Sequence, residues 1–209
     1  MRTAILTMSV AAALAAPLAN AAIYDFNASL SGLNENPPTA STGTGVATLS
    51  YNDFGTASVA DDRYSFTLSV AGLTGAATGF HIHGAATTVE NAPVRVALDA
   101  APFVSLNSGG ALLVGANNVP APATIPATPA SATNAGHPEM SFLNLLLGPD
   151  AGPVGFAYVN VHTAAFPGGE IRGQLVQVTA VPEPGTYALM LAGLGFVGWV
   201  ASRRRIPQV

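Results

Sequence analysis

Apolar and polar residues alternate in several short stretches of this chain, and this alternation constrains its fold more than any other feature. In residues 64–70, YSFTLSV, aromatic and aliphatic residues alternate with Ser and Thr. A period of two places the apolar side chains on one face of a β-strand. Residues 24–30 and 46–51 follow related patterns, and further strands are expected at 78–83, 93–98, 155–162 and 171–179. Short strands separated by Gly, Pro and Asn predict an all-β fold, an antiparallel β-sandwich or barrel.

Two segments depart from this pattern. Residues 115–137 are rich in Ala, Pro, Thr and Asn without periodicity, which predicts a flexible surface loop. Residues 138–147 start with Pro138 and Glu139, continue as an apolar run and are followed by Gly148. These are start and stop signals of a helix, so we expect one short helix here, with a Leu-rich strand as the alternative.

The composition narrows the classes of protein to which the chain can belong. It has no cysteine, so disulfides cannot stabilise it and hydrophobic burial must do so. Its basic residues are all arginine. In residues 22–180, three arginines stand against ten acidic residues, a net charge of −7. This charge argues against a nucleic-acid partner, because phosphates require a basic face.

Residues 1–21 predict a secretory signal peptide with a short apolar helix. Arg2 precedes an apolar run over residues 4–18, and Ala19 and Ala21 form a small-x-small cleavage site for a signal peptidase. The run is too short for a stable span, which needs about 20 residues. We therefore expect the mature chain to begin near Ala22.

Residues 181–209 predict a second targeting segment. The prolines at its start block a helix before the apolar stretch, and a cluster of arginines after it resists translocation. Residues 186–202 lie at the short limit of a transmembrane helix. They predict a C-terminal anchor in the inner membrane, with the body outside. The flanking residues are Val181, Pro182, Glu183 and Pro184 before the stretch and Arg203, Arg204 and Arg205 after it.

These three parts, in this order, resemble the PEP-CTERM sorting signal. The resemblance implies that a membrane exosortase removes the helix, so that the anchor is transient and the protein ends at the cell surface or outside the cell. A permanent anchor is the alternative. Hosts of this family tend to be Gram-negative bacteria that make extracellular polysaccharide, which makes exopolysaccharide a candidate partner beside the signal peptidase and the exosortase.

Three histidines lie on expected strands and carry the only candidate chemistry. His81 and His83 are two residues apart, so they project from one face of their strand. His162 lies on another expected strand and shares its face with Tyr158 and Asn160. If the two strands are neighbours, the three imidazoles can converge on one copper or zinc ion and leave a position open.

Two alternatives remain open for the histidines. His137, in the expected loop, supplies either a fourth ligand or none. The histidines can also hydrogen-bond to backbone and cap a sheet edge without any metal.

Two sequence blocks carry a family resemblance. Residues 79–85, GFHIHGA, and 158–175, YVNVHTAAFPGGEIRGQL, together with the opening segments at 30–38 and 43–45, are similar to the CHRD domain, named after chordin. The resemblance extends from about Tyr24 to Val178. The Ala/Pro-rich insertion looks longer than the family needs, which should change a surface loop and not the core.

The resemblance implies an immunoglobulin-like β-sandwich or barrel and no defined reaction, since a fold does not fix a function. Residues 80–84, FHIHG, are also similar to the copper-binding strand of Cu/Zn superoxide dismutase, another β-sandwich. Four histidines and no cysteine cannot reproduce its two-metal site and disulfide. At most one metal ion is expected.

A tight turn and an ion pair are expected in the second block. Residues 167–169, PGG, suit a turn that requires positive φ. Glu170 and Arg172 follow on one strand face, and a partly exposed ion pair between them is favoured over a binding role.

The sequence contains no nucleophile elbow, phosphate loop or paired catalytic carboxylates. We therefore expect a non-enzymatic binding or structural domain of the cell surface or biofilm matrix. A mononuclear copper or zinc module, for metal binding or redox chemistry, is the alternative.

Overall fold

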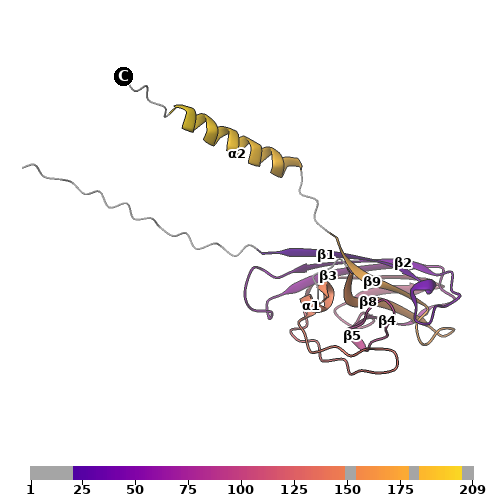
Figure 1. The fold of residues 1–209 in the computed structure, drawn as a ribbon. Helices are drawn as coiled ribbons and strands as arrows, with labels where there is room; N and C mark the ends of the chain where they lie inside the picture. Colours follow the sequence, from indigo (N-terminus) through magenta and orange to yellow (C-terminus); the bar gives the residue numbers. More distant parts are fainter. Residues whose placement is uncertain (1–20, 149–153, 179–183, 204–209) are drawn as a thin grey trace, which may run out of the picture.

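The computed structural model describes residues 21–148, 154–178 and 184–203 (Figure 1). In these residues, one nine-stranded sheet has the order β5-β4-β8-β9-β1-β2-β3-β7-β6, with every neighbouring pair antiparallel. The strands are β1 (Ile23–Ser31), β2 (Thr44–Asn52), β3 (Arg63–Ala71), β4 (Ala77–His83), β5 (Val94–Ala97), β6 (Val104–Ser108), β7 (Ala111–Pro120), β8 (Val154–Thr163) and β9 (Ile171–Val178). The helical elements are η1 (Gly32–Asn34), α1 (Phe142–Leu147) and α2 (Pro184–Arg203).

The sheet curls so that one of its edges returns to the far end. The side chain of Asn107 on β6 accepts from the backbone N–H of Ala77 at 2.9 Å and donates to its carbonyl at 2.7 Å, on β4. Leu73 donates to the carbonyl of Gly110 at 3.0 Å beside this contact. These bonds join the β6 edge of the sheet to β4, the second strand from its other edge. The all-β prediction is confirmed (Figure 1).

The core lies inside the curl. Alternate residues of β1, β2 and β3 point inward and are buried, as the period of two predicts. Helix α1 packs against β8 and β9, and its Phe142 lies 5.2 Å from Tyr64 and 6.2 Å from Tyr51, ring centre to ring centre. Burial of a large apolar side chain contributes about 1.5–3 kcal/mol. The largest contributors include Phe26, Leu49, Phe66, Leu68, Ile82, Leu112, Phe142 and Leu145.

The expected helix exists but begins later than predicted. Ser141 is its N-cap, and its side chain accepts from the backbone N–H of Asn144 at 3.1 Å. Gly148 ends the helix at φ 75°. Met140, just before the cap, pairs with Ile125 in an isolated bridge, so the residues after Pro138 are extended and not helical.

The predicted surface loop over 115–137 is wrong at its beginning. Residues 115–120 belong to β7, which continues along β3 across a register shift. Strands β6 and β7 were not expected, because the alternation is weak here and every residue of β6 is exposed. Farther on, the segment folds back on itself through bridges Ile125↔Met140, Thr128↔His137 and Ser131↔Asn134.

The two ends are described only in part. The predicted signal peptide, with Ala19, lies outside the described residues except for Ala21. So do Val181, Pro182, Glu183, Arg204 and Arg205 of the predicted sorting segment. Helix α2 is present, but among the described residues no helix is long and apolar enough to cross a membrane, so the transmembrane assignment of 186–202 is not confirmed.

Candidate metal centre

Strands β4 and β8 are neighbours, which brings the three strand histidines together. In the register of this pair, His81 lies opposite Asn160, and His162 lies opposite Gly79. A Cβ on Gly79 would come within 3.0 Å of the His81 ring and 3.9 Å of the His162 ring. The missing side chain therefore leaves room for the two rings to approach each other.

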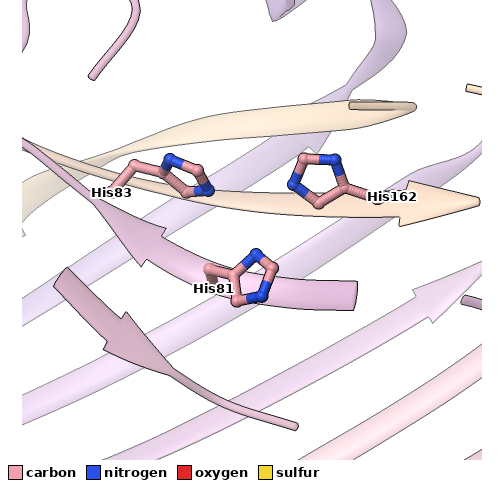
Figure 2. Close-up of side chains that lie close together, drawn as sticks. All are labelled: His81, His83 and His162. Atoms are coloured by element: carbon pink, nitrogen blue, oxygen red, sulfur yellow. The ribbon is translucent and has the colours of Figure 1, made fainter. Parts of the chain in front are cut away.

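The three imidazoles face one another across the strand pair (Figure 2). Their ring centres are 5.3 Å apart for His81 and His162, 5.5 Å for His81 and His83, and 5.9 Å for His83 and His162. One nitrogen from each ring lies within 4.8 Å of the other two. The expected convergence of His81, His83 and His162 is thus present in the structure.

Each ring has one nitrogen near an acceptor and one buried nitrogen without a partner. The Nδ1 of His83 lies 2.8 Å from the carbonyl of Ala92, and the Nδ1 of His162 lies 3.0 Å from that of Pro167. The Nε2 of His81 lies 3.6 Å from Oδ2 of Asp99. The buried nitrogens without a partner are His81 Nδ1, His83 Nε2 and His162 Nε2.

Burial favours the neutral form of two of the rings. Burial lowers the pKa of His83 to about 4, against a smaller opposing effect of its hydrogen bond to Ala92. Burial also lowers the pKa of His162 below its ordinary value. A neutral imidazole that donates from Nδ1 has its lone pair on Nε2, and this is the form that binds a metal ion.

The donor set fits a small transition-metal ion. Zinc bonds to imidazole nitrogen at about 2.0–2.1 Å, which places three ligand nitrogens about 3.3–3.6 Å from one another. The rings would therefore have to move together by rotation about their side-chain bonds. Three neutral imidazoles suit zinc or copper, and they leave a coordination position open.

The edge-capping alternative does not fit the topology, because β4 and β8 both have strands on each side. The backbone contacts that it requires do exist, but they use only one nitrogen of His83 and one of His162. His137 lies elsewhere: its Nε2 is 3.3 Å from Glu90, and its ring is 4.4 Å from that of Phe156. It does not supply a fourth ligand in this structure.

Aromatic and cationic groups cover one side of the cluster. The ring of Tyr158 stacks on His83 with centres 5.0 Å apart and an angle of 13° between the planes. The guanidinium carbon of Arg172 lies 3.5 Å from the centre of the Tyr158 ring, a cation–π contact. The guanidinium donates to neutral acceptors: the carbonyls of Glu90 and Thr87 and the side chains of Asn91 and Gln174.

The expected ion pair of Glu170 and Arg172 is wrong. Both residues are buried, at 0 and 1 % exposure, and each has its own partners. Glu170 accepts from Ser41 at 2.7 Å and from the backbone and hydroxyl of Thr74 at 2.8 Å, and also from Thr163. Burial opposes its charge, but these hydrogen bonds outweigh burial and hold the pKa of Glu170 below its ordinary value.

Two acidic residues beside the cluster were not predicted from the sequence. Asp99 follows β5 and faces His81, while Glu35 follows η1 and accepts from Asn160 at 3.2 Å. No spacing pattern pointed to either, because both come from loops. The shared face of Tyr158, Asn160 and His162 was recognised from the period of two, and it is confirmed by the register of β8.

Comparison with known proteins identifies the domain family and a sorting motif. The CHRD domain family matches residues 26–175, which include all of the cluster, and the PEP-CTERM protein-sorting motif matches residues 180–205. No curated protein and no solved structure matches the chain. The sorting motif implies export, processing by an exosortase and a cell-surface or extracellular location. The chain belongs to the CHRD domain family.

Proposed function

We propose that this protein is an exported surface domain whose non-enzymatic role is to bind one copper or zinc ion through His81, His83 and His162. One observation carries the proposal: three buried imidazole nitrogens without a partner lie within reach of a common point. Buried polar atoms nearly always have a hydrogen-bond partner, so three in one cluster require an explanation. A metal ion satisfies all three at once.

The surroundings of the rings support the same proposal. Metal-binding histidines usually donate their second N–H to a carbonyl or carboxylate, which fixes the ring and makes the ligand nitrogen more basic. Ala92 and Pro167 offer carbonyls at that distance to His83 and His162. Asp99 offers a carboxylate to His81 across 3.6 Å.

Metal analysis of the purified protein tests the proposal. After loading with copper or zinc and removal of the excess, we expect about one ion per wild-type chain and almost none in the double variant His81→Ala/His83→Ala. His137→Ala is the matched control, because it removes a partly buried histidine outside the cluster, and it should keep the ion. Substoichiometric metal in the wild type after both loadings would contradict the proposal. Redox cycling of bound copper is the alternative role, and a copper-loaded protein that catalyses electron transfer would favour it.

The surface or matrix location rests on the sorting motif. Deletion of residues 181–209 should release the protein freely into the medium, because the segment that directs sorting is gone. An unchanged distribution between cell surface and medium would count against this part of the proposal. Exopolysaccharide is the candidate matrix partner, and co-sedimentation with it tests that partner separately.

A further inference from the structure

Glu35 and Asn160 form a buried polar pair beside the histidine cluster. Glu35 directly follows η1 and is 7 % exposed, and Asn160, in the middle of β8, is 4 % exposed. The Nδ2 of Asn160 donates to Oε2 of Glu35 at 3.2 Å. This bond uses one oxygen of the carboxyl and one of the two polar atoms of the amide.

The two remaining oxygens lack a partner, and both lie close to one glycine. Oε1 of Glu35 and Oδ1 of Asn160 are buried with no donor. A Cβ on Gly169 would lie 2.8 Å from each of them, so the two atoms border the same small space. Two acceptor oxygens in such a position repel each other unless a proton lies between them.

We infer that Glu35 is protonated near neutral pH and forms a two-bond ring with Asn160, in which Oε1–H donates to Oδ1 while Nδ2–H donates to Oε2. The ring gives a partner to both orphaned oxygens without any added group. Rotation of the amide by 180° gives the same ring with the two carboxyl oxygens exchanged.

Among the described residues, Glu35 forms no ion pair with the cation that faces it. Arg172 approaches from β9, but its hydrogen bonds go to the neutral acceptors named above. Tyr158 approaches from β8 and also interacts electrostatically with Glu35. Burial is the largest effect and raises the pKa of Glu35 to about 7, while Arg172 and the bond from Asn160 oppose it.

The ring connects the segment after η1 to residues 87–92, here called the covering loop, which supplies the acceptor for the ring of His83. Asn36, next to Glu35, donates to the carbonyl of Val89, and its own carbonyl accepts from Asn91 at 2.7 Å. Ala92, the next residue, holds Nδ1 of His83. Loss of the proton from Glu35 therefore loosens the cover of the cluster as pH rises through about 7. This inference does not depend on a bound metal ion.

The variant Glu35→Gln separates a shared proton from an ion pair. Glutamine copies the protonated acid, because its amide can donate to Oδ1 of Asn160 at every pH. Unfolding by urea is measured on the purified metal-free protein from pH 5 to 9. The folded pKa of Glu35 lies above the unfolded value, so its contribution favours folding at low pH and is lost as pH rises from 4.5 through about 7. At pH 8, we expect the unfolding constant of Glu35→Gln to be on the order of a hundredfold smaller than that of the wild type, with near equality at pH 5.

The exposed Glu139→Gln is the matched control and should follow the wild type at every pH. If Glu35→Gln is less stable than the wild type at pH 8, or does not fold there, Glu35 is a charged partner of Arg172 and the inference is wrong. Parallel curves for wild type and variant would also overturn it. A second measurement needs no variant: an infrared band of a protonated carboxylic acid should be present at pH 6 and disappear by pH 9. Its absence at pH 6 would contradict the ring.

Discussion

The outer surface of the sheet has two halves, which differ in the type and burial of their outward side chains. Over β2 and β3, outward side chains are mostly Ser and Thr in contact with solvent, such as Thr48 and Thr67, whose hydroxyls lie 2.7 Å apart. Over β4 and β8, outward side chains are histidine, tyrosine and asparagine. His83, Tyr158 and Asn160 are 8, 2 and 4 % exposed, although they point away from the core.

This difference distinguishes the half of the sheet that serves as scaffold, over β2 and β3, from the half that contains the candidate site, over β4 and β8. Burial of a polar group costs free energy unless a hydrogen bond replaces its water. The half over β2 and β3, here called the open half, avoids that cost because its polar side chains contact water. The half over β4 and β8, here called the covered half, buries polar side chains and leaves imidazole and carboxyl atoms without a hydrogen-bond partner. A chain that needed only a stable sheet could have left both halves open. The candidate site therefore lies in the covered half.

The largest effect on stability is expected at Arg172, the cation buried in the covered half. Arg172→Met should destabilise the protein by about 3–5 kcal/mol, because it leaves the carbonyls of Glu90 and Thr87 without donors and removes the contact with Tyr158. Urea unfolding at pH 7 measures this loss. Arg63→Met, on the open half, is the control and should cost less than about 1 kcal/mol, since Arg63 donates only to nearby backbone carbonyls. Equal effects of the two variants would remove the distinction between the halves.

The next effect comes from a pair of adjacent glycines in the turn before β9. Gly169 has φ 131°, and a Cβ there would lie 2.8 Å from Glu35 and Asn160. Gly169→Ala should therefore cost about 2–3 kcal/mol through backbone strain and disruption of the buried pair. At Gly168 a Cβ would meet no atom within 4 Å, so Gly168→Ala should be nearly neutral. Thermal unfolding of the two variants checks this, and a stable Gly169→Ala would mean that the space beside Glu35 is not closed.

Much of the fold follows from local pattern. Seven of the nine described strands were expected from the sequence, the clearest of them from a period of two, which reports which face is buried. The pattern missed β6, whose residues are all exposed, and β7, whose alternation breaks at a register shift. The Ala/Pro-rich composition then favoured a loop where the chain continues as a strand. Pairing with β3 makes that segment a strand, and the local sequence carries no information about such a pairing.

The histidine cluster was predictable only in part, for a related reason. Spacing within a strand placed His81 with His83, but their contact with His162 depends on β4 and β8 being neighbours. Partners from loops, Asp99 and Glu35, had no sequence signal. The expected Glu170–Arg172 pair failed because spacing alone does not show what else surrounds a residue. The carboxylate of Glu170 already accepts hydrogen bonds from Ser41, Thr74 and Thr163, so it does not need Arg172 as a partner.

A smaller effect on stability is expected at Glu90, whose carboxylate holds the covering loop through hydrogen bonds. Glu90 accepts from the backbone N–H groups of Thr87 and Ala135 at 2.8 and 2.6 Å, and His137 lies beside it. Burial opposes its charge, but these hydrogen bonds prevail and lower the pKa of Glu90 to about 2. Its folded pKa lies below the unfolded value, so its contribution is present above pH 4.5 and is lost as pH falls toward 2.

Glu90→Gln should therefore destabilise the protein by about 1–2 kcal/mol at pH 7, and the difference from wild type should shrink between pH 4.5 and 2. Urea unfolding across this range measures it. Glu139→Gln, in the nearby exposed segment, is again the control. A difference that grows on acidification would mean that Glu90 does not hold the loop as a carboxylate.

The smallest effect is expected on the open half. Thr67→Ala removes the hydroxyl contact with Thr48 across β2 and β3. Both hydroxyls face water, which replaces the lost bond, so the cost should be only about 0.2–1 kcal/mol, including the lower strand propensity of alanine. Metal content after loading should equal that of the wild type, because no atom of the cluster contacts this pair. A loss of metal in Thr67→Ala would show that the two halves are coupled through the core, and the open half could then no longer be treated as scaffold alone.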